Sequence, residues 1–198
     1  PSGNFGNAYS AWFGRSNGLS INQIFCSTNV NDVLRRFIDG GVLEPLVTQP
    51  SVAPSMDIQI PSSLERLIFD LSTEAKEFYA QLQNSTKAQL GEKSVDALKS
   101  VFSSVTFSDE MIKTRITSLH DEFGIIFDPH TVTSVQMALD NDSSLPTVAV
   151  ATASPEKFGN VISPLINGFT ESKIDQKEQY LTLSTENAAI IEAIKAFI

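Results

Sequence analysis

Apolar side chains near the start of the chain recur three and four positions apart, at Phe5, Tyr9, Trp12 and Phe13. This spacing is that of one face of an α-helix, and Gly18 is suited to end that helix. The seven residues that lead into it, PSGNFGN, contain two glycines and two asparagines. The pattern therefore predicts a short polar loop followed directly by an amphipathic helix.

The next segments alternate between strand and helix patterns. INQIFCST is an apolar run that predicts a strand. NDVLRRFIDGG predicts a short helix with Asn31 as its N-terminal cap and Gly40–Gly41 at its end. The order helix, strand, helix predicts α/β layering around a largely parallel sheet. Residues 42–61 carry four prolines, which excludes a regular helix and predicts a long ordered loop.

Several helices are predicted in the middle of the chain. SSLERLIFDLSTEAKEFYAQLQ begins with a serine cap and has the pattern of a helix. Residues 84–107 are polar and weakly patterned, which predicts a peripheral insertion. SDEMIKTRITSLHDEFG predicts a helix that opens on Ser108 and closes at Gly124. DPHTVTSVQMALD predicts another, with Asp128 as its cap and Pro129 at its first position.

Two patterns complete the fold prediction. LPTVAVATAS is apolar and β-branched, and it predicts a second strong strand that ends in small polar residues. STENAAIIEAIKAFI predicts a terminal amphipathic helix. The fold class expected from these elements is α/β, with a layered, mostly parallel sheet and a helical C-terminal portion.

Composition narrows the class of protein. Hydrophobic residues make up 41% of the 198 residues and charged residues 19%, which is typical of a globular chain. The formal net charge of −9 argues against nucleic-acid binding, which needs clustered lysine and arginine. No apolar run approaches the ~20 residues of a membrane span, so no membrane partner is expected. Cys26 is the one cysteine and lies in an apolar run, which predicts a buried thiol and fits a cytoplasmic, reducing compartment.

The opening loop is the sharpest chemical signal. A glycine-rich turn at a helix N-terminus directs several backbone N–H groups to one point, and the helix dipole favours an anion there. Gly3 and Gly6 allow close approach of the backbone to a phosphate, and the side chains of Asn4 and Asn7 offer further donors. An ordinary helix entry explains the same residues, because G-x-x-G is a weak pattern.

Five motifs occur along the chain in this order: PSGNFGN, STNVNDVLRRF, PSMDI, DPHT and ATASPEKF. Together they resemble threonine synthase, a pyridoxal-phosphate enzyme of fold type II. The resemblance covers residues 1 to about 70 and about 118 to 165. It implies that residues 1–198 are an incomplete C-terminal portion of the family's large domain. Where the family typically has a histidine in a TAHPAKF motif, this chain has Ser154.

The resemblance implies a cofactor, pyridoxal 5'-phosphate, and the residues that hold it. The loop that binds the cofactor phosphate, chiefly through backbone N–H groups, corresponds here to Gly3, Asn4, Phe5, Gly6 and Asn7. The threonine of the last motif contacts the pyridine nitrogen, and that position is Thr152. Thr152 also ends a predicted strand, where ligands of open α/β sheets bind. A satisfied hydroxyl at a strand end explains Thr152 equally simply.

Other motif residues are weaker candidates. Asn29, Asn31 and Arg36 are candidates for binding a substrate phosphate, because the guanidinium fork of an arginine matches phosphate oxygens. A helix cap at Asn31 and a solvated helix face at Arg36 explain these residues as well. His130 lies in the first turn of a predicted helix, where the positive end of the helix dipole disfavours a charged imidazolium, so a neutral hydrogen-bonding imidazole is expected. Helix capping alone explains the DPHT motif as well. Ser55, Met56 and Asp57 are candidates for the wall of the site or for simple loop packing. Neither histidine has metal-ligand spacing with a carboxylate, so no metal is expected.

The implied activity of the parent enzyme is the conversion of O-phosphohomoserine and water to threonine and phosphate. Such enzymes need a lysine that forms a Schiff base with the cofactor. None of the nine lysines here lies in the family's phenylalanine-lysine-aspartate context, so the catalytic lysine is expected upstream, in a missing N-terminal part. The chain alone is then expected to be inactive and prone to self-association. The alternatives are a threonine-synthase-like phospholyase and a non-catalytic, phosphate-binding pseudo-enzyme.

Overall fold

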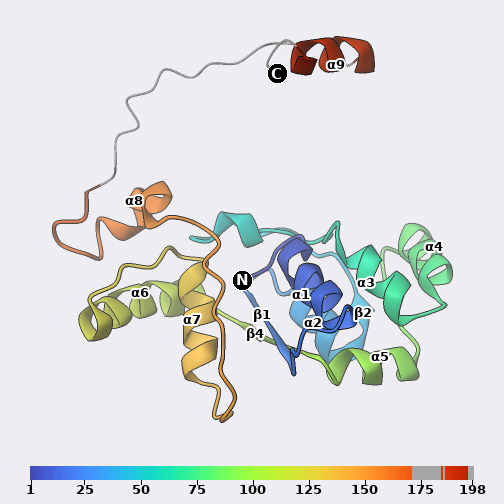
Figure 1. The fold of residues 1–198 in the computed structure, drawn as a ribbon, viewed down its shortest axis with the longest axis horizontal. Helices are drawn as coiled ribbons and strands as arrows, with labels where there is room; N and C mark the ends of the chain where they lie inside the picture. The colour runs from blue at the N-terminus through green and yellow to red at the C-terminus, as the bar shows by residue number, and fades with distance from the viewer. Residues whose placement is uncertain (171–183, 185, 196–198) are drawn as a thin grey trace.

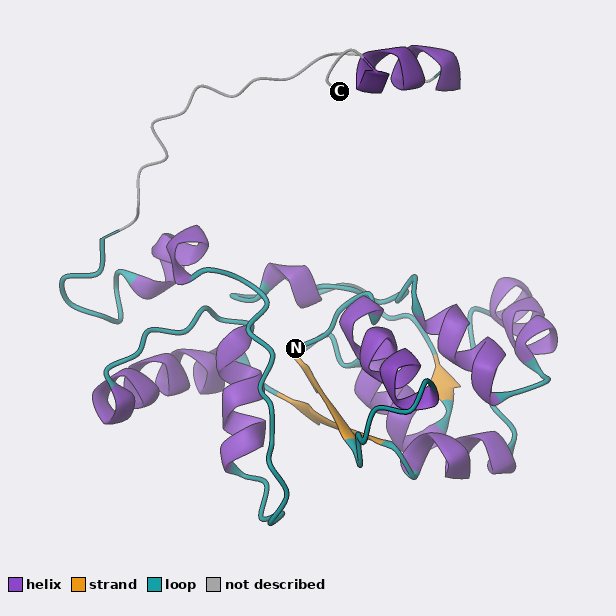
Figure 2. Ribbon diagram, viewed as in Figure 1, coloured by secondary structure: helices purple, strands orange, loops and turns teal. Residues whose placement is uncertain are grey.

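The computed structural model describes residues 1–170, 184 and 186–195 (Figure 1). This part of the chain is mainly helical, with short strands at its centre (Figure 2). Along the chain, the helices and strands are α1 Gly6–Ser16, β1 Ile24–Thr28, α2 Val33–Gly40, β2 Val42–Leu43, α3 Leu64–Leu71, α4 Ala75–Ser85, β3 Ala88–Gln89, α5 Glu92–Lys99, β4 Phe102–Thr106, α6 Asp109–Phe123, α7 Thr131–Leu139, α8 Gly159–Ile162 and α9 Asn187–Lys195. Two 3₁₀ turns lie in the long loops, η1 Pro54–Met56 and η2 Pro155–Phe158.

A pair of parallel strands organises the fold. β1 pairs with β4 in register, from Ile24 opposite Phe102 to Thr28 opposite Thr106. Four of the five residues of β1 are buried, as expected for a parallel strand covered on both faces. A shorter antiparallel pair joins β2 to β3. The predicted combination of α/β layers with parallel strand pairing is therefore confirmed.

The helices form two groups on either side of β1 and β4 (Figure 1). Helices α1 to α5 enclose one apolar core, in which the rings of Phe5 and Phe102 lie 5.6 Å apart. Helices α6, α7 and α8 enclose a second core together with η1. Cys26 is buried in the first core, and burial raises the pKa of its thiol to about 12. The predicted burial of this thiol is confirmed. None of the helices described is long and apolar enough to cross a membrane.

The prediction that residues 84–107 form a peripheral insertion is wrong. This segment contains β4, which is paired along its whole length with β1. Leu98 and Phe102 are fully or almost fully buried in the first core. The apolar positions of the segment are divided between a helix and a strand, so neither periodicity lasts long enough to stand out in the sequence.

The predicted strand at residues 145–154 does not form. The segment is a loop beside α7, and its Val148 and Val150 side chains are 84% and 54% exposed. A strand requires a neighbour that pairs with its N–H and C=O groups. No such ladder is present among the described residues, so a strong local strand propensity is left without its tertiary partner.

Some helix boundaries follow the sequence signals and others do not; α1, for example, ends at Ser16 with Asn17 as its C-cap, one residue before the predicted Gly18. In α6 the Ser108 hydroxyl accepts from the Met111 N–H, and Gly124 ends the helix with φ +67°, as predicted. The helix expected over SSLERLIFDLSTEAKEFYAQLQ is divided into α3 and α4 by Ser72, which is extended. Asn31 does not cap α2, because the N-cap is Asp32 and the Asn31 side chain is bonded elsewhere. The terminal helix is present as α9.

Candidate functional site

The loop of residues 1–7 turns into α1 through an unusual backbone conformation. Phe5, the N-cap, has φ +69°, a left-handed value that is rare for a bulky residue. Burial of its ring against Phe102 holds it there. Backbone N–H groups have no hydrogen-bond acceptor within the described part of the chain at Gly3, Asn4, Phe5, Gly6 and Asn7. Successive free N–H groups around a left-handed residue at a helix N-terminus form a cradle for an anion.

The cradle is fixed to its surroundings at several points. The Ser2 N–H donates to the carbonyl of Ser27 at the end of β1, at 3.1 Å. The Ser63 N–H donates to the Asn4 carbonyl at 2.9 Å. Gly3 packs against η1 so closely that a Cβ on it would lie 2.4 Å from the Ser55 carbonyl oxygen. Position 3 therefore has room only for a glycine. A Cβ on Gly6, in contrast, would make an ordinary contact of 3.7 Å with the Ser63 hydroxyl.

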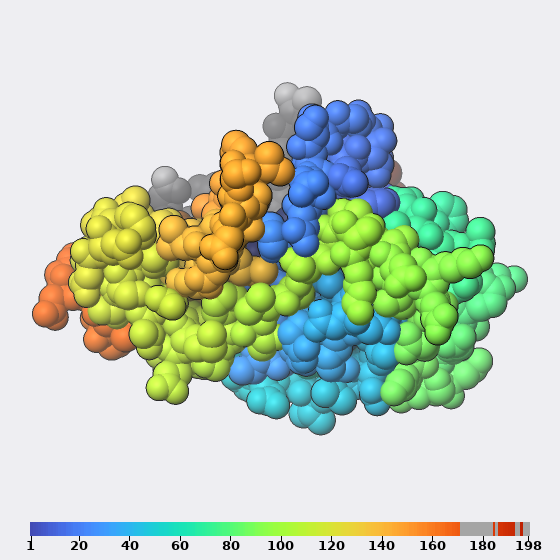
Figure 3. Space-filling view, turned by 90° about the horizontal axis from the view of Figure 1, so that it is seen from below, coloured from blue at the N-terminus to red at the C-terminus, as the bar shows by residue number. Residues whose placement is uncertain are grey.

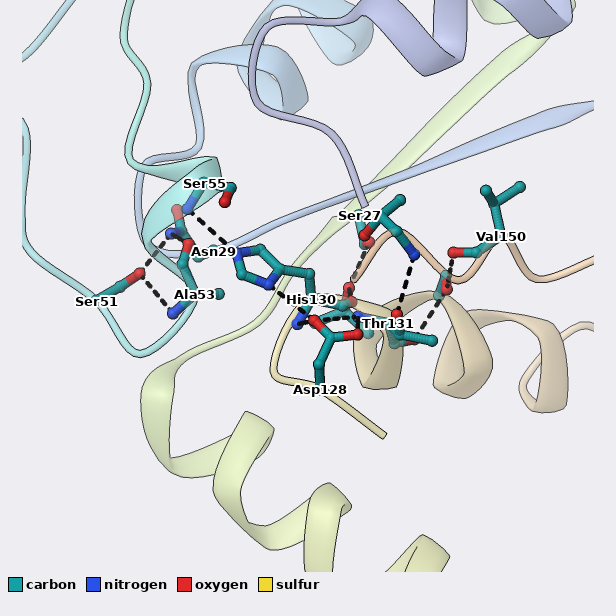
Figure 4. Close-up of polar contacts among 12 residues, drawn as sticks. Ser27, Asn29, Ser51, Ala53, Ser55, Asp128, His130, Thr131 and Val150 are labelled. Carbon is teal, nitrogen blue, oxygen red and sulfur yellow. Dashed lines mark hydrogen bonds and ion pairs between the residues drawn. The ribbon is translucent and has the colours of Figure 1, made fainter. Parts of the chain in front are cut away.

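A buried carboxylate and histidine stand beside the cradle, at the start of α7 (Figure 4). The Asp128 carboxylate accepts from the backbone N–H of His130 at 2.9 Å and contacts its ring Nδ1 at the same distance. The other ring nitrogen, Nε2, accepts from the Ser55 N–H at 3.1 Å. Burial by itself raises the pKa of Asp128, but the hydrogen bonds from His130 and Thr131 outweigh it, and the pKa is lowered. α7 begins at Thr131 with His130 as its N-cap, so the prediction of Asp128 as the cap and Pro129 as the first helical residue is wrong. The Asp128 carboxylate nevertheless accepts from the backbone N–H groups of His130 and Thr131, just ahead of the helix.

This depressed pKa makes stability depend on acid. A carboxyl whose pKa is lower in the folded than in the unfolded chain contributes stability above its ordinary pKa of 3.8, and that contribution is lost as the pH falls through the folded value. We expect the free energy of unfolding to decrease between about pH 5 and pH 2, and to decrease less in Asp128→Asn. Urea melts at both pH values measure this. Equal pH dependence in the two proteins would contradict the assignment.

Polar side chains connect β1, the start of α7 and the last motif. The Ser27 and Thr133 hydroxyls lie 2.6 Å apart. The Thr131 hydroxyl accepts from the backbone N–H of Thr152 at 3.2 Å, and the Ser134 hydroxyl donates to the carbonyl of Val150 (Figure 4). The structure thus brings the cradle, DPHT and ATAS to the carboxyl end of β1, where ligands of open α/β sheets bind. The Thr152 side chain is exposed and has no hydrogen bond to the described residues.

Asn29 and Asn31 belong to a buried network that holds the loop of residues 49–59. Both side-chain amides donate to the Asp57 carboxylate, at 2.6 and 3.0 Å. The same carboxylate accepts from the backbone N–H and the hydroxyl of Ser51. The Asn29 amide also donates to the Ala53 carbonyl, and the Asn31 carbonyl oxygen accepts from the Gln49 N–H. These asparagines fix a loop and present no free amide to a ligand.

The four predicted substrate residues are therefore engaged inside the protein. Arg36 pairs with Asp32 at 2.9 Å and donates to the Glu44 carbonyl. His130 has both ring nitrogens bonded and is 2% exposed. Of the candidates for wall or packing, Ser55 lies with its carbonyl against Gly3 and Met56 is buried, whereas Asp57 holds the loop of residues 49–59. The sequence patterns did not single out the hydroxyls of Ser27, Thr131 and Thr133, although Ser27 begins STNVNDVLRRF and Thr131 ends DPHT.

An apolar groove of about 610 Å³ lies between β1 and residues 145–150. Its walls include residues 20–26 on one side and Met137 with Val148 on the other, and Asn7 of the cradle lines its end. Figure 3 shows the orange segment before η2 standing beside the blue segment that leads into β1. Within the ranges that the structure covers, no cluster of three or more histidine, cysteine, aspartate or glutamate side chains is placed to bind a metal.

The chain is similar to threonine synthases over nearly its whole length. It is 31% identical to threonine synthase from Pseudomonas aeruginosa, over 96% of this chain and 43% of that one. With threonine synthase from Saccharomyces cerevisiae the identity is 28%, over 93% and 41%. It is 29% identical to threonine synthase-like 1 from Macaca fascicularis, over 98% and 28%. No protein-family model matches the chain.

Solved structures give the same result for the fold. The crystal structure of threonine synthase from Brucella melitensis with bound pyridoxal phosphate superposes with a TM-score of 0.83 and 29% identity, over 99% of this chain and 45% of that one. Threonine synthase from yeast superposes with a TM-score of 0.79 and 28% identity, over 87% and 38%. The chain has the fold of part of a fold type II pyridoxal-phosphate enzyme. Within that class the chain resembles threonine synthase, as its motifs indicated, and it spans less than half the length of these relatives.

Proposed function

We propose that this chain is the phosphate-binding portion of a threonine synthase, and that the whole protein converts O-phosphohomoserine and water to threonine and phosphate. The observation that carries the proposal is the cradle: five successive backbone N–H groups without an acceptor in the described chain, curved around the left-handed Phe5. The similarity of the chain to a threonine synthase whose structure contains pyridoxal phosphate supports the choice of that cofactor. Residues 1–198 then form a C-terminal portion of the large domain.

Each part of the site has a role in this proposal. The cradle from Gly3 to Asn7 binds the cofactor phosphate, and the dipole of α1 favours the negative charge. The Thr152 hydroxyl binds the pyridine nitrogen. A carboxylate at this position would favour protonation of that nitrogen, whereas an uncharged hydroxyl does not. The cofactor, when bound, supplies an electron sink for the substrate. The lysine that binds the cofactor covalently lies outside these residues, since no lysine here has the expected context.

The test is product analysis on the full-length protein. Incubated with pyridoxal 5'-phosphate and O-phosphohomoserine, it is expected to release threonine and inorganic phosphate in equal amounts. The similarity to threonine synthase-like 1 is a reason to test a second candidate, a phospholyase, which would release phosphate, ammonia and a keto acid instead. Binding of pyridoxal phosphate without turnover of any phosphorylated amino acid would indicate the pseudo-enzyme. Two predictions concern the 198-residue chain by itself. We expect it to be inactive, which a turnover assay measures, and to self-associate through exposed apolar side chains, which light scattering measures.

Thr152→Val is expected to weaken cofactor binding by up to about tenfold in the full-length protein. The change removes the hydroxyl at nearly constant volume, and a net hydrogen bond contributes about 1 kcal/mol. The Thr152 backbone bond to Thr131 does not depend on the side chain, so the free energy of unfolding should stay within ~0.5 kcal/mol. Fluorescence titration with the cofactor measures the first and a urea melt the second. Unchanged affinity would place the cofactor ring elsewhere.

A further inference from the structure

The turn η1 forms the support of the cradle. The Ser55 carbonyl oxygen lies so close to Gly3 that it leaves no room for a Cβ. A Cβ on Gly3 would also lie 3.2 Å from the Met56 Cα and 3.0 Å from the Ile58 side chain. Met56 is buried, so the turn is anchored in the second core. Because Gly3 lies directly against this turn, a shift of Ser55 must shift the backbone of the cradle.

Two side chains hold η1 in place, one at the residue before the turn and one within it. The Asn29 amide donates to the Ala53 carbonyl at 3.2 Å, just before the turn. Within the turn, His130 Nε2 accepts from the Ser55 N–H at 3.1 Å (Figure 4). The second bond acts on the residue that contacts Gly3. It links His130 of DPHT, just before α7, to the turn that supports Gly3, which lies 127 positions earlier in the chain.

The bond from Ser55 requires one tautomer of His130. An N–H can donate only to a ring nitrogen that carries no proton, so Nε2 must be the unprotonated one. The Asp128 carboxylate, 2.9 Å from Nδ1, accepts a hydrogen bond from the N–H of that nitrogen and thereby selects this tautomer. The ring also packs on Phe158 of the ATASPEKF motif, with centroids 4.8 Å apart. Asp128 therefore selects the tautomer of the imidazole, and Phe158 together with Asp128 fixes the orientation of the ring.

We propose that His130 is a positioning residue for the cofactor phosphate, acting through the Ser55 peptide and Gly3 on the curvature of the cradle. The inference rests on the proposed function, because it takes the cradle to bind the phosphate of pyridoxal 5'-phosphate. His130 does not touch the phosphate itself. Its role differs from that of an ordinary core histidine, whose loss destabilises the protein without a particular effect on the phosphate.

Two isosteric replacements separate the two ring nitrogens. The amide of asparagine reaches the position of Nδ1, so His130→Asn keeps a donor for Asp128 and loses the acceptor for Ser55. The amide of glutamine reaches the position of Nε2, so His130→Gln keeps the acceptor. His130→Leu also lacks the acceptor but fills the apolar contact with Phe158, and it serves if the asparagine variant does not fold. His120→Asn, on α6, makes the same change at the other histidine of the chain as a matched control.

The measurement compares two ligands of the full-length protein: pyridoxal 5'-phosphate and pyridoxal, which lacks the phosphate. The dissociation constant of pyridoxal divided by that of pyridoxal 5'-phosphate measures how much the cradle contributes to binding. We expect this ratio to fall about tenfold in His130→Asn and His130→Leu, and to change less than about threefold in His130→Gln and His120→Asn. Thermal melts of all four variants show how much fold stability each has lost.

The outcomes are distinguishable. If the full-length protein binds pyridoxal 5'-phosphate no better than pyridoxal, the proposed function fails and the inference with it. If it prefers the phosphorylated form but His130→Asn and His130→Leu weaken both ligands equally, the proposed function stands and His130 is a core residue only. A fall in the ratio as large for His130→Gln as for His130→Asn would also overturn the role assigned to Nε2.

Discussion

Gly3→Ala is expected to weaken the binding of pyridoxal 5'-phosphate to the full-length protein by about 10- to 100-fold. The new Cβ would meet the Ser55 carbonyl oxygen at 2.4 Å, the Met56 Cα at 3.2 Å and Ile58 at 3.0 Å. Two of these atoms are backbone, so the loop or the turn must move. Overpacking of this kind costs ~1–3 kcal/mol, and every 1.4 kcal/mol corresponds to a factor of ten in affinity. Fluorescence titration with the cofactor measures the loss.

A glycine elsewhere in the chain provides the control. Gly40, near the end of α2, has a helical conformation, and a Cβ there would meet only the Val42 side chain at 4.0 Å. Gly40→Ala is expected to leave cofactor affinity unchanged and to stabilise the fold by up to ~1 kcal/mol. If Gly3→Ala binds the cofactor as well as Gly40→Ala does, the loop of residues 1–7 is not the phosphate site.

Asp57→Ala is expected to lower the free energy of unfolding by about 3 kcal/mol. The Asp57 carboxylate accepts four hydrogen bonds: the amides of Asn29 and Asn31, and the backbone N–H and hydroxyl of Ser51. Each buried donor that is left unpaired costs ~1–3 kcal/mol, although the two amides keep other acceptors. Because the same network holds Ala53 at the start of η1, cofactor affinity should fall as well. Urea melts and cofactor titration measure the two effects.

Asp39→Ala is the matched control for this prediction. Asp39 makes one ion pair, with Arg35 at 2.9 Å, and its side chain is half exposed. Exposed pairs of this kind contribute ~0.2–1 kcal/mol, so the free energy of unfolding should change little and the cofactor affinity not at all. Equal destabilisation by the two substitutions would show that the loop of residues 49–59 does not depend on the Asp57 network.

Local signals in the sequence predicted many of the elements. The three-and-four spacing from Phe5 to Phe13 and the serine cap and final glycine of α6 each depend on residues within a turn or two of one another. Such signals act through backbone geometry and neighbouring side chains, so they are readable without the fold. The motif order was sufficient to indicate the family resemblance and to select the loop of residues 1–7 as the candidate phosphate site.

Only the tertiary structure decided which segments meet. β4 enters the sheet because β1, more than 70 positions earlier, offers a parallel edge, whereas the stronger strand pattern at residues 145–154 has no pairing partner in the described chain. The uses of Asn31 and His130 were likewise undecided, since a cap, a ligand and a buried bridge need the same side-chain atoms. Their partners, Asp57 and Ser55, lie 26 and 75 positions away. Hydrogen bonds over such separations depend on how the chain folds back on itself, which no local pattern encodes.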